Sequence, residues 1–242
     1  SPASAANLVI SELMYHPAGL TASEINAGIV DPDQFEYIEL MNISDGSVTL
    51  DGARFVDGVE YDFAQDTILA PEERLVIARD RGAFLQRHPA FSGTLAADGF
   101  LDGTGLSNGG ERLRMVDAAG ADIRDFTYND RVPWPEGADG QGYSIVLIAP
   151  ELNPDHGLAH NWRSSVFPGG SPGEGDAVIF EGEAEADSDG DGMSAFLEHA
   201  LGTSDDVGGG SGFSVVSDGS GDLLIMHPRN LAADDAVLSM EV

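Results

Sequence analysis

The sequence predicts an all-β fold, a sandwich or a barrel, for the greater part of its 242 residues. Two observations carry this prediction: short apolar runs recur between residues 7 and 173, and Gly- and Asp-rich turn signals separate them. Length supplies a third, because about 165 residues can bury roughly 70% of their unfolded surface. Such a core needs no disulfide, and the chain contains no Cys.

Eight strands are expected in this region. The first covers residues 8–15 and stops at His16-Pro17, and the second covers 35–42. Six shorter runs follow at 53–56, 60–63, 74–78, 112–116, 123–128 and 143–148. Asp57-Gly58 and Ala119-Gly120 are typical of hairpin turns. Residues 79–88 are expected to be the one helix of the domain, with Phe84 and Leu85 on its apolar side.

A calcium-loop pattern follows the β-rich region. The run from Asp187 to Glu198 matches D-x-[DN]-x-[DN]-G-x5-E at every fixed position. Calcium takes six to eight hard oxygen ligands, and Gly192 permits the sharp turn that brings them together. The expected ligands of Ca²⁺ are the carboxylates of Asp187, Asp189, Asp191 and Glu198 and the main-chain carbonyl of Met193. An acidic linker without metal is the alternative, because acidic runs are common in a chain of this composition.

The remaining segments complete the expected organisation. Residues 1–6 are interpreted as a linker or a processed end, and 174–206 as an acidic calcium-binding loop with a short helix over 194–201. Gly202 is a C-terminal stop for that helix. Residues 207–212 are a flexible Gly-rich linker. Residues 213–242, with strands expected at 213–216, 223–227 and 237–242, are too few to close a core and are interpreted as the start of a truncated domain.

Charge limits the partners. The chain has 42 acidic and 11 basic residues, a formal charge of −31, and all its basic residues are Arg. Such a charge disfavours nucleic acid and anionic lipid as partners. No apolar run approaches the ~20 residues of a membrane span. The composition suits salty or calcium-rich surroundings, where cations screen self-repulsion, and therefore an extracellular or cell-surface location.

Six segments resemble the bacterial lamin-tail domain. Residues 8–13 are similar to its opening strand, 35–42 to its E-[FY]-[IV]-E-[IL]-x-N strand, and 48–53, 69–78 and 106–111 to its turn motifs. Trp162 and Gly170-Ser171-Pro172-Gly173 resemble its closing signature. The resemblance implies an immunoglobulin-like β-sandwich and no enzyme. Residues 174–206 resemble the single-loop calcium linkers of the thrombospondin type 3 and dockerin-like kind, without tandem copies.

Three glutamates lie in apolar strands. If the strands are regular, Glu39 shares a face with Phe35, Tyr37 and Met41, and Glu12 with Leu8, Ile10 and Met14. A carboxylate in such surroundings needs a partner. Glu12, Glu36 and Glu39 are therefore expected to be hydrogen-bonded structural residues, paired with Arg54 or Arg163. A cation or ligand site and a paired-carboxylate hydrolase site are the alternatives.

No other pattern predicts a catalytic site. His156 and His160 stand at i and i+4, but Gly157 occupies the place where a zinc protease needs Glu, so a surface loop is expected. Residues 103–109 have a partial G-x-G pattern that no helix follows. Ser11, Ser44 and Ser144 lack the context of a nucleophile, and Trp134, Trp162 and Tyr143 are interpreted as packing residues rather than a binding platform.

The sequence thus predicts a non-catalytic, calcium-binding structural or adhesion module of a large secreted or cell-surface bacterial protein. Its expected partners are calcium, other surface proteins or glycans, and further domains of the same polypeptide. The alternatives are an accessory domain of a secreted hydrolase, phosphoesterase or spore-coat-protein-H-type kinase, and a self-assembling component of a surface layer or filament. The full open reading frame separates these three.

Overall fold

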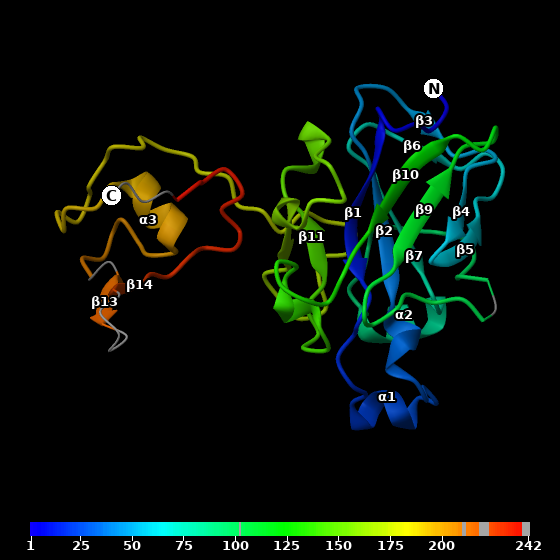
Figure 1. Ribbon diagram of the computed structural model, residues 1–242, viewed down its shortest axis with the longest axis horizontal. Coiled ribbons are helices and arrows are strands. Elements are labelled where there is room, and N and C mark those ends of the chain that lie inside the picture. The colour runs from blue at the N-terminus through cyan, green and yellow to red at the C-terminus, as the bar shows by residue number, and fades with distance from the viewer. Residues whose placement is uncertain (102, 210–211, 218–222, 239–242) are drawn as a thin grey trace. The chain divides into compact units, whose positions relative to one another are not determined.

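The computed structural model describes residues 1–101, 103–209, 212–217 and 223–238 (Figure 1). The chain divides into two compact units, Ser1–Asp176 and Ala177–Val242. The domain limits drawn from the sequence stay predictions, because compactness alone does not show independent folding. Among the described residues, no helix is both long and apolar enough to span a membrane.

A six-stranded sheet forms the centre of the first unit. Its order is β12-β11-β1-β2-β7-β8, and all neighbours are antiparallel except β7 and β8. The strands are β1 (Leu8–Met14), β2 (Tyr37–Asn42), β7 (Arg74–Ala78), β8 (Thr94–Leu95), β11 (Ile145–Leu147) and β12 (Trp162–Ser164). Every residue of β1 and β2 is buried, so both faces of the sheet are covered at these central strands.

A four-stranded antiparallel sheet packs on one of these faces (Figure 1). Its order is β10 (Asp122–Thr127), β9 (Arg112–Val116), β4 (Arg54–Asp57) and β5 (Val59–Asp62). The two expected hairpin turns are present, with φ of +80° at Gly58 and +88° at Gly120. A two-stranded sheet of β3 (Val48–Thr49) and β6 (Ile68–Leu69) lies at one end.

The core of the first unit lies between the two large sheets. The alternation along β5 shows how: Val59 and Tyr61 are buried, and Glu60 and Asp62 are exposed. The inward-facing residues of both sheets form one cluster, which includes Leu8, Ile10, Leu13, Ile38, Leu40, Ile77, Phe55, Tyr61, Leu113, Met115 and Phe126. The predicted immunoglobulin-like β-sandwich is therefore confirmed.

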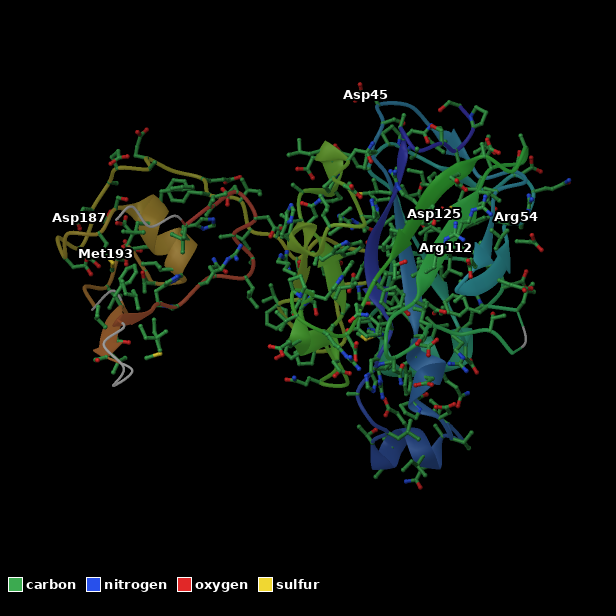
Figure 2. All side chains as sticks on the ribbon, in the orientation of Figure 1. Asp45, Arg54, Arg112, Asp125, Asp187 and Met193 are labelled. Atoms are coloured by element: carbon green, nitrogen blue, oxygen red, sulfur yellow. The ribbon has the colours of Figure 1, made fainter. Side chains whose placement is uncertain are left out.

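The outer face of the four-stranded sheet is charged. Arg112 of β9 forms a two-bond pair with Asp125 of β10 and also contacts Asp57, and Arg114 pairs with Asp122 (Figure 2). Each exposed pair contributes little to stability. Together they make this face polar and leave the inner face to the core.

Short helices connect the strands. They are α1 (Ala22–Asn26), α2 (Arg81–Arg87) and the 3₁₀ helices η1 (Pro32–Phe35), η2 (Glu136–Ala138), η3 (Pro150–Leu152) and η4 (Ala159–Asn161). The helix predicted over 79–88 is present in shortened form, because the Asp80 side chain accepts from the N–H groups of Gly82 and Ala83. Its buried residues are Ala83 and Phe84. Leu85 is 44% exposed, so its predicted packing is wrong.

The termini of the sandwich differ from expectation. Residues 1–6 do not form a free linker: Ala3 is buried, its N–H donates to the Thr49 carbonyl over 2.9 Å, and Thr49 N–H donates to Ser1 over 2.8 Å. At the other end, Asp176 forms a buried ion pair with Arg163 at 2.5 Å. The sandwich therefore holds both of its terminal segments by specific contacts.

The second unit is smaller, and its described residues form loops, one helix and a hairpin. The helix predicted over 194–201 is present as α3 (Ala195–Leu201), capped by Ser194 and ended by Gly202 at φ +79°. β13 (Ser214–Ser217) and β14 (Leu223–Met226) pair as an antiparallel hairpin, close to two predicted strands. Residues 237 and 238 of the third predicted strand are not in a strand, and 239–242 lie outside the described residues, as do 210–211 of the Gly-rich stretch and 218–222.

Candidate functional site

A β-bulge brings two buried glutamates side by side on the face of the six-stranded sheet that points away from the main core. The register between β1 and β2 shifts between Ile10 and Glu12, and beyond the shift Glu12 lies directly opposite Glu39. Because the extra residue turns the strand over, Glu12 does not share a face with Leu8 and Ile10, which point into the main core. The prediction is wrong for Leu8 and Ile10, since period-two alternation does not hold across a bulge. Met14, two residues beyond Glu12, belongs with Tyr37 to a separate cluster.

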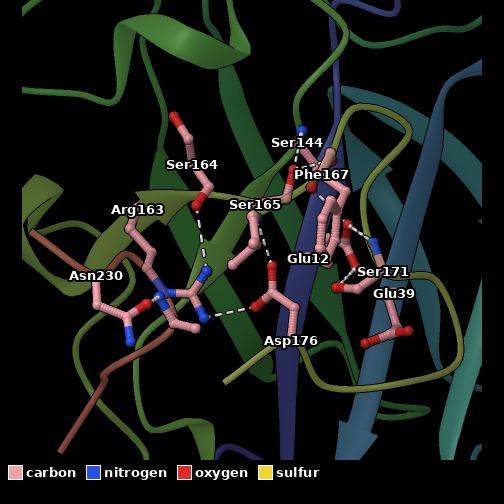
Figure 3. A network of polar contacts seen from close by, with 12 residues as sticks. Glu12, Glu39, Ser144, Arg163, Ser164, Ser165, Phe167, Ser171, Asp176 and Asn230 are labelled. Carbon is pink, nitrogen blue, oxygen red and sulfur yellow. Dashed lines mark hydrogen bonds and ion pairs between the residues drawn. The ribbon is translucent and has the colours of Figure 1, made fainter. Parts of the chain in front are cut away.

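The two carboxylates hold a closing strap, which we define as residues 168–173 (Figure 3). Oε1 of Glu12 accepts from the Tyr37 hydroxyl at 2.6 Å, the Ser144 hydroxyl at 2.5 Å and the Ser171 N–H at 2.9 Å. Oε2 of Glu12 accepts from the Ser171 hydroxyl at 3.1 Å. The Gly173 N–H donates to Oε2 of Glu39 over 2.6 Å. The strap is thus tied to β1 and to β2.

The arginine partners differ from those predicted. Arg74 of β7 donates to Oε1 of Glu39 at 2.5 Å, which also accepts from Ser11, and Arg79 donates to Glu36 at 2.8 Å. Arg54 instead donates to main-chain carbonyls, and Arg163 pairs with Asp176. The predicted pairing with Arg54 or Arg163 is therefore wrong. The observed partners are Arg74, on the β7 strand next to β2, and Arg79, which directly follows β7.

The three glutamates are hydrogen-bonded structural residues. Glu12 is 1% exposed, Glu36 and Glu39 are 0% exposed, and all four oxygens of the Glu12–Glu39 pair accept hydrogen bonds from protein groups. Donors pointing at a carboxylate occupy the positions that a cation would take. Burial beneath the strap also denies access to a substrate. The expectation of hydrogen-bonded structural glutamates is confirmed.

Burial shifts the ionisation of these groups. It raises the pKa of Glu12 from 4.5 to about 7, and the negative charge of Glu39 adds to the increase. Burial likewise raises the pKa of Glu36 to about 8, although the Leu106 N–H and Arg79 oppose it. For Glu39 burial raises the pKa and Arg74 opposes the rise. A proton held near Glu12 therefore relieves the repulsion between two buried carboxylates, of which Glu39 is paired with Arg74.

Stability of the sandwich should consequently fall as pH rises. The unfolded chain releases these protons near pH 4.5, whereas the folded protein keeps them until about pH 7 at Glu12 and about pH 8 at Glu36. The stabilisation is complete below pH 4.5 and is lost as pH rises through 7 to 8. Between pH 5 and pH 8 the two glutamates lower the free energy of unfolding by about 6 kcal/mol. His88 and His156 oppose this by about 4 kcal/mol, because burial lowers their pKa values to about 4 and about 3 and the unfolded chain loses its histidine protons near pH 6.5. We therefore expect a net decrease of about 2 kcal/mol, most of it between pH 6.5 and pH 8. Urea unfolding followed by tryptophan fluorescence measures it, because both Trp residues are buried in this unit.

The matched variants are Glu12→Gln and Glu60→Gln. The first keeps an accepting oxygen and removes one titrating group, so it should flatten the pH dependence. The second removes a charge from the exposed face of β5 and should leave the slope unchanged. Equal slopes in the wild type and in Glu12→Gln would contradict the assignment of the proton to this pair.

The acidic loop of the second unit gathers its predicted aspartates. One carboxylate oxygen from each of Asp187, Asp189 and Asp191 lies within 4.8 Å of the others. The loop turns at Gly190 and Gly192, where φ is +76° and +94°. Oδ1 and Oδ2 of Asp187 accept from the N–H groups of these two glycines at 2.9 and 3.1 Å. The loop backbone thus orients the carboxylates toward one another (Figure 2 labels Asp187 and Met193).

Glu198, on α3, lies outside that three-residue cluster and is 1% exposed. Within the described part of the chain, no group donates a hydrogen bond to its Oε2 or to the buried Oδ2 of Asp189. Burial raises the pKa of Glu198, the Thr203 side chain opposes the rise, and Asp189, Asp191 and Asp205 add to it by their negative charges. Buried carboxylate oxygens without donors are the arrangement that a hard cation satisfies, so the residues present fit calcium.

Other residues considered from the sequence serve the fold. His156 is not in a surface loop: it is buried, its Nε2 accepts from the Ile10 N–H at 3.1 Å, and its Nδ1 donates to the Pro154 carbonyl at 3.0 Å. Burial lowers its pKa to about 3, so the ring is neutral. His160 is exposed, as predicted for a loop. The spacing of His156 and His160 did not predict the structural role of His156, because that role depends on a hydrogen bond from Ile10 of β1, a strand distant in sequence.

The remaining candidates are also structural. Trp134 and Trp162 belong to the main core, and Tyr143 is half-buried beside it. Ser11 and Ser144 are buried and donate to Glu39 and Glu12, and Ser44 donates to Asn42. Residues 103–109 form turns ahead of β9, without a helix. The sequence indicated the closing motif but did not predict that its Ser171 and Gly173 donate hydrogen bonds to the buried carboxylates.

The geometry agrees with the comparison to known proteins. A family model of the lamin tail domain matches residues 1–130, which is more than half of the 242 residues. The match covers β1 and β2 with their paired glutamates but ends before the strap. No curated protein and no solved structure matches the chain. The family is generally non-enzymatic. The chain belongs to the lamin tail domain family.

Proposed function

We propose that this chain is a calcium-binding interaction module of a secreted or cell-surface bacterial protein. The sandwich contributes a rigid, non-catalytic body with an acidic surface. The acidic loop contributes the calcium site. Other surface proteins or glycans, and further domains of the same polypeptide, are the partners that this composition suits.

The observation that carries the calcium proposal is the unpartnered, buried Oε2 of Glu198 beside three clustered aspartates. Leaving a buried acceptor without a donor is costly, and a cation relieves both this cost and the repulsion among the carboxylates. Asp187, Asp189, Asp191 and Glu198 would hold the ion with the Met193 carbonyl, as the register of the motif predicts. Bound calcium would neutralise charge and connect the loop to α3.

The location outside the cell is supported by composition. A formal charge of −31 with no Lys destabilises a compact chain by self-repulsion, and calcium and salt in the surroundings screen it. Calcium can also stabilise a small unit where disulfides are absent, and this chain has no Cys. A weak extracellular calcium site would be filled under those conditions.

Calorimetric titration with calcium tests the site. The wild type is expected to bind one ion with a dissociation constant on the order of 10⁻⁴ to 10⁻³ M, as extracellular modules do. The double variant Asp187→Ala, Glu198→Ala should show no binding heat, because it removes the first and last ligands. Magnesium should bind more weakly, since it requires a smaller octahedral site.

The matched control is Glu181→Ala with Glu185→Ala. These two exposed residues belong to the same unit and carry the same charge, but lie outside the motif. The control should titrate like the wild type. Equal heats from the wild type and the Asp187, Glu198 variant would sink the proposal, and a comparable loss in the control would reduce the site to nonspecific screening.

A further inference from the structure

The loop is held by a residue outside the calcium motif. Ser188 occupies the second position of the loop, which the motif leaves unspecified. Its N–H donates to Oδ1 of Asp205 at 3.0 Å, and its hydroxyl donates to Oδ2 of the same carboxylate at 2.5 Å. A carboxylate that receives two hydrogen bonds from one residue fixes both the position and the orientation of that residue. Asp205 therefore sets where the loop begins its turn.

The stretch that carries Asp205 touches the loop a second time. It follows α3, and the N–H of Gly209 donates to Oδ2 of Asp191 at 3.3 Å. An added side chain at Gly208 would meet Asp189 and Asp191 at 3.9 Å, which shows how closely this stretch passes. We define residues 203–209 as the closing segment. The sequence predicted that 207–212 is a flexible linker, but the structure attaches Gly209 to a predicted calcium ligand.

The chain has a single match to the calcium motif, so the contacts that steady the loop must come from elsewhere in the unit. The closing segment, which follows α3 in the chain, supplies these contacts through Asp205 and Gly209. The negative charge of Asp205 repels the four predicted carboxylate ligands. The two hydrogen bonds that Asp205 accepts from Ser188 offset this cost and fix the position of the loop.

We propose that Asp205 is the positioning residue that closes the calcium loop, so that calcium binding and ordering of residues 203–209 are coupled. This inference rests on the proposed calcium site and adds to it. Asp205 acts through Ser188 and is not itself a ligand. Calcium would then convert the connection after α3 from a flexible to a fixed one, which would set how the following hairpin is attached.

Three variants separate positioning from charge. Asp205→Ala removes both hydrogen bonds and one charge. Asp205→Asn removes the charge but keeps an oxygen for the Ser188 N–H and an amide that can donate to the Ser188 hydroxyl. Asp206→Ala removes an equal charge from the neighbouring residue, whose side chain is exposed and makes no hydrogen bond among the described residues. Each is titrated with calcium alone in the full chain.

We expect Asp205→Ala to weaken calcium binding 10- to 100-fold, as loss of an outer-shell partner typically does. Asp205→Asn should stay within about threefold of the wild type, and Asp206→Ala should be unchanged. Hydrogen exchange gives an independent readout: calcium should slow exchange of the 203–209 amides in the wild type, whereas saturating calcium should leave them unprotected in Asp205→Ala.

Two results would overturn the inference while leaving the calcium site intact. One is a wild type that binds calcium with an Asp205→Ala variant that binds equally well. The other is an Asp205→Asn variant as weak as Asp205→Ala, which would make the charge of Asp205 the active property. A wild type that binds no calcium would instead refute the site itself. If Asp205→Ala fails to fold, Ser188→Ala decides, with about threefold weaker binding expected and no change counting against the inference.

Discussion

A chain ending at Asp130 is expected not to fold cooperatively, although it contains every residue that the family model matches. It lacks β11 and β12, so the edge of β1 is unpaired. It also lacks the buried side chains of Trp134, Ile145, Leu147 and Trp162. Loss of one such buried side chain costs about 2–5 kcal/mol. The summed cost of the four is therefore comparable to the whole stability of a typical domain, about 5–15 kcal/mol.

Polar losses add to the apolar ones. Without residues 131–176, Glu12 loses the Ser144 and Ser171 donors, and Glu39 loses the Gly173 N–H. Both carboxylates would then be buried with too few partners or be exposed to water in an incomplete sheet. The missing segment is therefore an internal part of the sandwich and not an appendage.

Two truncations test this expectation. Residues 1–130 should give no cooperative thermal transition and poorly dispersed amide resonances. Residues 1–178, which keep the Arg163–Asp176 pair, should melt cooperatively near the temperature of the same unit in the full chain. A cooperative melt of 1–130 would show that the strap and the last two strands are dispensable.

The substitution Gly170→Ala is expected to destabilise the sandwich by at least about 3 kcal/mol. Gly170 has φ +78°, and a Cβ there would lie closer than 3.0 Å to the hydroxyls of Tyr37 and Ser144 and to Oε1 of Glu12. These atoms belong to side chains that are buried and hydrogen-bonded, so they cannot move aside. The strap would have to lift and would break the bonds from Ser171 to Glu12.

Gly120→Ala is the matched control. Gly120 has φ +88° in the hairpin between β9 and β10, and nothing lies within 4 Å of its added Cβ. It therefore reports the cost of the backbone conformation alone, about 1–2 kcal/mol. Chemical denaturation of both variants measures the difference. Equal destabilisation would show that contact with the carboxylate pair does not constrain Gly170.

The buried glutamates show where local reasoning from sequence ends. Apolar neighbours indicated that Glu12 and Glu39 need partners, and that holds. The identity of the partners did not follow, because the bulge at Ser11 changes which side chains share a face. Arg74 reaches Glu39 only because β7 pairs with β2 in a register that no local pattern encodes.

The calcium loop shows the opposite case. Its aspartates converge as the motif predicts, because the loop is a few residues long and turns at glycines. Helix α3 likewise begins at Ser194 and ends at Gly202, where local capping rules place its limits. The role of Asp205 was not predicted, because this residue follows α3 in the chain and lies 17 residues after Ser188.

Sequence alone therefore determined eight strands of the sandwich, the hairpin turns, the family resemblance and the spacing of the acidic loop, all of which depend on residues near one another in the chain. It did not predict the short strands β3, β6, β8 and β12. Only the tertiary structure decided which arginines pair with the glutamates, that His156 is a core residue, that 170–173 closes the sandwich over Glu12 and Glu39, and that Asp205 holds the loop. The physical reason is that these contacts depend on strand register and chain return, and both are settled by packing of the whole unit rather than by local preference.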